Sequence, residues 1–140
     1  MSIAALTVAA CLSPGRAEDV SVSGKHERQV FPPDASQAVV QHRALLIDVR
    51  EPYERRSGSP HGVAAEITYF MDGRHDDEFV AAVSRQANGN RAAPLILICE
   101  AGPRSEMAQR VLAARGFTAV KTVVNGFQGW LDMDMPRRSP

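Results

Sequence analysis

The stretch that decides the fold is Pro94–Arg115, PLILICEAGPRSEMAQRVLAAR. Its first part, Pro94–Cys99, is a short aliphatic run, which is typical of a strand buried on both faces of a parallel sheet. A loop containing Gly102 follows at once, and Arg104–Arg115 is predicted to be an amphipathic helix. This order of strand, loop and helix predicts an α/β fold. The apolar positions expected on one face of the helix are Met107, Ala108, Val111 and Leu112.

The rest of the chain continues this alternation on both sides of the stretch. Further strands are expected at Ala44–Val49, Ala65–Phe70 and Ala119–Val124. Further helices are expected at Ala35–Gln41 (capped by Asp34), Tyr53–Ser57 (a single turn), Asp76–Ala87 and Phe127–Met133. We therefore predict a three-layer α/β sandwich in which helices flank a mainly parallel sheet. Sites in such sheets lie beyond the carboxyl ends of the strands, and Cys99 stands at one of these ends.

The composition excludes several classes of protein. The chain has 140 residues, of which 44% are apolar and 23% charged, so one globular domain is expected rather than a disordered chain. With 16 basic and 16 acidic residues the formal net charge is zero, so there is no general attraction for nucleic acid or anionic lipid. The two cysteines, Cys11 and Cys99, exclude a disulfide-rich scaffold and a zinc site made mainly of cysteine. His26, His42 and His75 show no ligand spacing, so no metal is expected.

The N-terminal run Ile3–Leu12 is too short to span a bilayer and resembles the core of a signal peptide. Small residues precede a cut after Ala17, so residues 1–17 are predicted to be a signal peptide, although Met1-Ser2 lacks the usual positive charge. Two alternatives stay open: a lipoprotein signal with a lipidated Cys11, and a retained, buried segment. Export predicts a periplasmic or secreted protein, and retention a cytoplasmic one. The rest divides into a lead-in at 18–32, one domain at 33–133 and a basic, frayed tail at 134–140.

Chemistry is expected in the loop Cys99–Ser105, CEAGPRS. Backbone N–H groups between a strand end and a helix start form an anion-binding nest, and the helix N-terminus adds a partial positive charge. Both favour the thiolate of Cys99, which is the nucleophilic form. Arg104 is expected to fold back and pair with an anionic substrate or hold the loop carbonyls, and Ser105 is expected to cap the helix. The alternative is a buried structural cysteine beside an unrelated arginine.

Four segments together resemble a single rhodanese-like (sulfurtransferase) domain over Pro33 to Leu131. They occur in the order and spacing of that family. They are Leu46–Pro52 (LIDVREP), Gly58–Val63 (GSPHGV), Cys99–Ser105 (CEAGPRS) and Asn125–Trp130 (NGFQGW). The resemblance implies the rhodanese-like fold and a catalytic Cys99. It also implies a substrate-binding loop made of Glu100, Ala101, Gly102, Pro103, Arg104 and Ser105.

The resemblance implies a reaction as well. Cys99 would take the outer sulfur of a persulfide, polysulfide or thiosulfate and become a persulfide, and a thiol, a protein thiol or cyanide would accept that sulfur. No metal or organic cofactor is implied. Dual-specificity phosphatases use the longer Cys-x5-Arg loop, whereas Cys99 and Arg104 form a Cys-x4-Arg loop, the size associated with sulfur transfer. The alternative function is a rhodanese-like module that senses a persulfide or docks a partner without turnover.

Glu100 departs from many thiosulfate-using members of the family, which carry Arg, Lys or His after the cysteine. A carboxylate there would disfavour the Cys99 thiolate and repel a dianion. We therefore hypothesise that thiosulfate is a poor donor and that a persulfide or polysulfide is preferred. A Glu100 that points into solvent would instead change little.

Two residues outside the loop, Asp48 and Arg50, are candidates for a supporting role. Asp48 and Arg50 end a predicted strand on the side of the sheet where Cys99 lies. They are expected either to form an internal ion pair that holds loops or to line the pocket. His61 lies in a Pro-His-Gly turn and is interpreted as a turn residue rather than a general base.

Overall fold

The computed structural model describes residues 27–140. The predicted signal peptide, Cys11 and most of the predicted lead-in therefore lie outside the described residues, and the export prediction stays a prediction. The described elements are β1 (Gln29–Val30), α2 (Pro32–Val40), β2 (Leu45–Asp48), the 3₁₀ helix η1 (Glu54–Ser57), β3 (Ser59–Pro60), β4 (Val63–Glu66), α3 (Asp76–Gln86), β5 (Leu95–Ile98), α4 (Pro103–Ala114), β6 (Val120–Val123), α5 (Gly126–Asp132) and β7 (Arg137–Arg138).

The main sheet is parallel throughout and has the strand order β1-β6-β5-β2-β4. Strand β5 lies at its centre, with Leu97 level with Ile47 of β2 and Thr122 of β6. All side chains of β5 are buried, because helices cover both faces of this strand. The predicted mainly parallel α/β sheet is confirmed.

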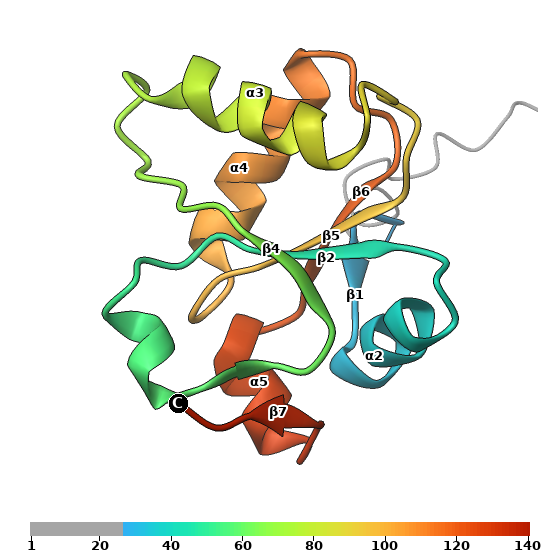
Figure 1. Cartoon of the computed structure of the whole chain (residues 1–140), viewed down its shortest axis with the longest axis vertical. Coiled ribbons are helices and arrows are strands. Elements are labelled where there is room, and N and C mark those ends of the chain that lie inside the picture. The colour runs from blue at the N-terminus through green and yellow to red at the C-terminus, as the bar shows by residue number, and fades with distance from the viewer. Residues whose placement is uncertain (1–26) are drawn as a thin grey trace, which may run out of the picture.

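Helices form a layer on each face of the sheet, as Figure 1 shows with α3 and α4 on one side and α2 and α5 on the other. Alternate residues of β5 point to opposite faces. Leu95, Leu97 and Cys99 pack in the core beneath α3 and α4, whereas Ile96 and Ile98 pack in the core that contains Phe127 and Trp130. The predicted three-layer sandwich is therefore present, and Cys99 belongs to its α3/α4 side.

Two predicted helix features are corrected. The first helix begins at Pro32 rather than Ala35, and Asp34 is not its cap but a residue of its first turn. Proline at this position loses no hydrogen bond, since the first helical N–H groups have no partner within the helix. The predicted apolar face of α4 is partly wrong. Met107 is exposed, whereas Gln109 is buried because its amide donates to the carbonyl of Val120 at 2.6 Å.

The predicted strand Ala65–Phe70 is shifted. Strand β4 begins directly after the Gly62 turn and ends at Glu66. It is an edge strand whose side chains alternate between half-buried and exposed, so it lacks the continuous apolar run used to find buried strands. The segment beyond Glu66 still follows β2, because Tyr69 donates its N–H to the carbonyl of Val49 at 3.0 Å.

A short strand lies near each end of the described residues, within the segments expected to be a lead-in and a frayed tail. Strand β1 adds an edge to the sheet by pairing Gln29 with Thr122. Strand β7 pairs antiparallel with β3, so Arg137 lies opposite Pro60. The carbonyl of Pro136 fixes this end further, because it accepts the indole N–H of the buried Trp130 at 2.9 Å. None of the helices in the described part of the chain has the length and hydrophobicity needed to cross a bilayer.

Candidate functional site

The predicted site residues meet where β2 and β5 end. Cys99 directly follows β5 and is 1% exposed. Its Sγ accepts the backbone N–H of Gly102 at 3.1 Å. The thiol also lies 3.5 Å from the hydroxyl of Ser105, which donates to the carbonyl of Gly102 at 2.8 Å. The loop therefore curls around the sulfur and holds it at the start of α4.

The cap of α4 differs from the prediction. Gly102, and not Ser105, is the residue that precedes the helix. Its φ of +118° is one that residues other than glycine rarely adopt. Pro103 then opens the helix. Among the hydrogen bonds of the described residues, none uses the N–H groups of Glu100, Ala101, Arg104 or Ser105. These N–H groups are free to bind an anion beside the sulfur.

The start of α5 clamps the loop from the other side of the sheet. Phe127 donates its N–H to the carbonyl of Cys99 at 2.8 Å, and Gln128 donates its N–H to the carbonyl of Glu100 at 3.0 Å. With their carbonyls bound in this way, Cys99 and Glu100 are fixed by a helix that is distant in the sequence. Gly126 makes this contact possible, since a Cβ there would lie 2.5 Å from the Cys99 carbonyl oxygen. The sequence indicated this segment only through the family resemblance of Asn125–Trp130, without the contact to the loop.

Replacing Gly126 with alanine is therefore expected to destabilise the fold by about 2–4 kcal/mol. The cost of a positive φ in alanine and the cost of the backbone clash add together. Gly126 has a φ of +56°, and Gly89, with a φ of +73° and no atom within 4 Å of an added Cβ, is the matched control. Urea unfolding should show a loss of only about 1 kcal/mol for Gly89→Ala, from backbone strain alone. Equal losses for the two variants would contradict the clamp.

Asp48 and Arg50 form a fully buried ion pair with an N–O distance of 2.8 Å. The remaining donors of Arg50 reach the carbonyls of Gly58 and Glu54 at 3.0 and 3.3 Å. Its guanidinium carbon also lies 4.1 Å from the centre of the Phe127 ring. Burial lowers the pKa of Arg50, but hydrogen bonds and charge from Asp48, followed by Glu100, raise it overall. Arg50 therefore stays charged and ties several loops together.

Glu100 adopts neither of the two orientations considered from the sequence. Its carboxylate accepts from Arg50 at 3.2 Å and from the side-chain amide of Gln128 at 2.5 Å. The side chain is 30% exposed. A buried cation thus compensates its negative charge in part, which weakens the argument that Glu100 alone repels anionic donors.

Arg104 is held differently from the prediction. Both of its terminal nitrogens bind the carboxylate of Glu54, at 2.6 and 3.0 Å, and none of its described hydrogen bonds reaches a loop carbonyl. Glu54 is a site residue that sequence reasoning missed. It belongs to η1 and is fifty positions away from Arg104 in the chain. The only signal for it was a carboxylate shortly after the strand that carries Asp48.

The other titratable candidates lie apart from the loop. His61 donates its backbone N–H to the carbonyl of Pro136, and His75 pairs with Asp72 at 2.6 Å. Within residues 27–140 no three His, Cys, Asp or Glu side chains are grouped as metal ligands would be.

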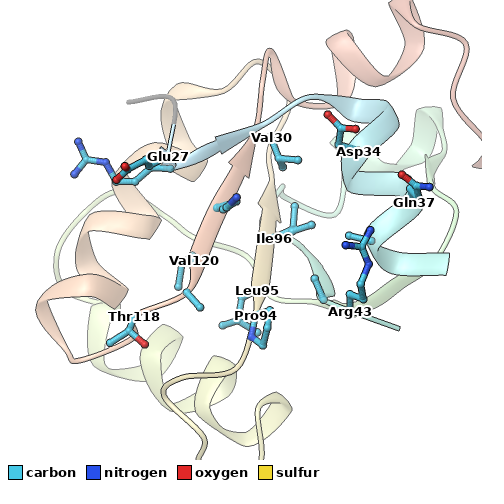
Figure 2. Close-up of a pocket in the computed structure, with 15 residues that line it drawn as sticks. Glu27, Val30, Asp34, Gln37, Arg43, Pro94, Leu95, Ile96, Thr118 and Val120 are labelled. Carbon is cyan, nitrogen blue, oxygen red and sulfur yellow. The ribbon is translucent and has the colours of Figure 1, made fainter. Parts of the chain in front are cut away.

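A hollow of about 550 Å³ lies between α2 and the strands β1, β6 and β5, as Figure 2 shows. Pro94 and Leu95 at the start of β5, Val120 at the start of β6, and Asp34 and Gln37 of α2 line it. No residue of the Cys99 loop contributes to this hollow. This hollow is therefore separate from the Cys99 loop.

Comparison with known proteins gives consistent results. The family model "Rhodanese-like domain" matches residues 32–133. Thiosulfate sulfurtransferase GlpE of Pseudomonas syringae is 32% identical over 101 residues, which are 71% of this chain and 84% of that protein. Thiosulfate sulfurtransferase 18 of Arabidopsis thaliana is 34% identical over 85% of this chain and 90% of that protein. The solved human single-domain sulfurtransferase shares the fold, with a TM-score of 0.58 and 22% identity over 75% of this chain and 96% of its own.

Proposed function

Since this chain belongs to the rhodanese-like domain family, we propose that it is a sulfurtransferase that carries sulfane sulfur on Cys99. The donors would be persulfides, polysulfides or thiosulfate, and the acceptors a small thiol, a protein thiol or cyanide. The observation that carries the proposal is the position of Cys99 Sγ within a loop in which Gly102 donates its N–H to the sulfur and four other N–H groups have no protein acceptor. Such a loop stabilises the negative charge of a thiolate and of the persulfide formed from it.

The reaction has two displacement steps. After Cys99 loses its proton to solvent, the thiolate attacks the outer sulfur of the donor, and the bond between this sulfur and the rest of the donor breaks. The donor leaves as a thiolate, or as sulfite when it is thiosulfate, with the electron pair of the broken bond. In the second step the acceptor attacks the outer sulfur of the Cys99 persulfide. Cys99 then leaves as a thiolate, and the acceptor becomes a persulfide or thiocyanate.

Each loop residue has a proposed part in these steps. Gly102 already donates its N–H to Sγ. The free N–H groups of the loop would bind the outer sulfur as its charge develops. The hydroxyl of Ser105 is close enough to exchange its bond to Gly102 for one to the sulfur. Asp48 and Arg50 are supporting residues, which act through the loops that Arg50 binds.

A second function is favoured by one observation. Cys99 is 1% exposed, so a donor has little access to the sulfur in this conformation. A module that docks a partner without turnover would need no such access, whereas a persulfide-sensing module would need it only for loading. The two functions differ in whether the sulfur on Cys99 can be discharged.

Incubation with a set of donors, followed by mass spectrometry of the intact protein and its peptides, tests the proposal. We expect a mass gain of about 32 Da, one sulfur atom, on the peptide that contains Cys99. Cyanide or a small thiol should remove this gain within the time of turnover. A stable adduct that no acceptor discharges would favour the sensing module, and no adduct from any donor on folded protein would overturn both persulfide functions.

A further inference from the structure

The guanidinium of Arg104 is already engaged by a protein carboxylate. Its two terminal nitrogens reach the two oxygens of Glu54, an arrangement that is among the strongest carboxylate contacts in proteins. The Glu54 side chain is 10% exposed and that of Arg104 22%, so solvent screens the pair only in part. An anionic donor that needs Arg104 has to displace Glu54 first.

Glu54 is itself held in place by the backbone. One of its carboxylate oxygens accepts the N–H of Glu51 at 2.8 Å. Burial raises the pKa of Glu54, but the hydrogen bonds from Arg104 and from the Glu51 N–H outweigh burial and lower it. Glu54 is therefore ionised at neutral pH and remains a competitor for Arg104.

The pair lies within electrostatic range of the sulfur. Hydrogen bonding to Glu54 raises the pKa of Arg104 against the opposing effect of burial, and the charges of Glu54 and then Cys99 raise it further. Arg104 also follows Pro103 in the first turn of α4, directly beyond the loop that encloses Sγ. Whatever binds Arg104 thus changes the charge that a donor meets at Cys99.

The other arginines around the loop are also paired. Arg50 has no exposed surface and binds both Asp48 and Glu100. Arg55 has an 11% exposed side chain and lies 3.8 Å from Asp48 and 3.7 Å from Glu66. Arg50, Arg55 and Arg104 therefore each have a carboxylate partner. The groups that remain to bind the charge of a donor are mainly the loop N–H groups.

We propose that Glu54 determines donor specificity: by occupying Arg104, it disfavours dianionic donors such as thiosulfate and favours small organic persulfides. This inference rests on the proposed function of Cys99. The loop N–H groups suffice for the single charge of a persulfide sulfur. Thiosulfate brings a second charge on its sulfonate oxygens, and a free guanidinium is the group that would bind these oxygens best.

The test is Glu54→Gln, which keeps an oxygen acceptor for the Glu51 N–H but removes the charge that holds Arg104. We expect kcat/KM with thiosulfate to rise about tenfold, mainly through KM, since one opposing charge near the anion is removed. With glutathione persulfide kcat/KM should change less than about twofold. The matched control is Asp77→Asn, which breaks the 2.6 Å ion pair with Arg115 away from the loop and should leave both values unchanged.

Calorimetric titration of thiosulfate into Cys99→Ser protein gives a readout that needs no turnover. Adding Glu54→Gln should tighten binding about tenfold at low salt, and adding Arg104→Gln as well should remove the gain. An unchanged ratio of thiosulfate to persulfide activity, or equal losses with both donors, would overturn the inference while leaving a wild-type Cys99 persulfide intact. Absence of any Cys99 adduct in the wild type would instead overturn the proposed function, and this inference with it.

Discussion

Replacement of Cys99 by serine is expected to abolish sulfur transfer, with kcat/KM lowered at least about a thousandfold for every donor. Serine is nearly the same shape, and its oxygen can still accept the N–H that Gly102 now gives to Sγ. An alkoxide is far less accessible than a thiolate at neutral pH and forms no persulfide. The variant therefore removes the nucleophile while it leaves the loop closed.

Three measurements make this result decisive. The free energy of unfolding of Cys99→Ser, measured with urea, should lie within about 1.5 kcal/mol of the wild-type value. The replaced side chain is buried but small. Peptide mapping should find no donor sulfur on the Cys99→Ser protein. The matched control Cys11→Ser should keep full activity, since Cys11 lies in the predicted signal peptide. Turnover that survives in Cys99→Ser, or that is lost in Cys11→Ser, would contradict the assignment of Cys99.

The Cys99 loop could be placed from the sequence because its determinants are local. An aliphatic strand, Gly102 and the start of a helix are adjacent in the chain, and their geometry follows from backbone chemistry. The order of parallel strands then puts Asp48 near Cys99, since β2 and β5 are neighbours. The position of the site in the fold was therefore predictable to this extent.

The partners of the loop could not be placed in the same way. Arg104 binds Glu54 and Glu100 binds Arg50 across fifty positions of sequence, and no periodicity indicates which carboxylate meets which guanidinium. The clamp by Gly126 and its neighbours depends on the close approach of α5 to the loop, which only the packed sheet produces. These contacts decide the charge and rigidity of the site, although the residues that carry the chemistry are local.

Errors in the fold arose at its edges for a related physical reason. Strands β1, β4 and β7 are short edge strands and lack the buried apolar runs by which β5 was recognised. Their pairing is fixed by backbone hydrogen bonds to strands found elsewhere in the chain. Side-chain patterns therefore predict the centre of such a sheet better than its borders.

The second large effect is expected for Arg50→Met, which should lower the free energy of unfolding by about 3–5 kcal/mol. Asp48 has no exposed surface, so removal of Arg50 leaves a buried carboxylate whose remaining cation is Arg55, 3.8 Å away and without the bidentate hydrogen bonds of Arg50. The carbonyls of Gly58 and Glu54 also lose a donor. Urea unfolding measures the loss. The stability of Arg50→Lys should lie between those of the wild type and Arg50→Met. Lysine keeps the charge but cannot reproduce the planar set of hydrogen bonds.

Two controls separate a buried charge from a general loss of packing. Arg56→Met changes an exposed arginine of η1 and should alter stability by less than about 0.5 kcal/mol. In the double variant Asp48→Asn/Arg50→Met the uncompensated charge is gone, so part of the stability should return relative to Arg50→Met. If the double variant were less stable than Arg50→Met, the cost would lie in lost packing rather than in a stranded carboxylate. In that case Arg50 would hold the Cys99 loop through its shape and its contact with Phe127, 4.1 Å away, more than through its charge.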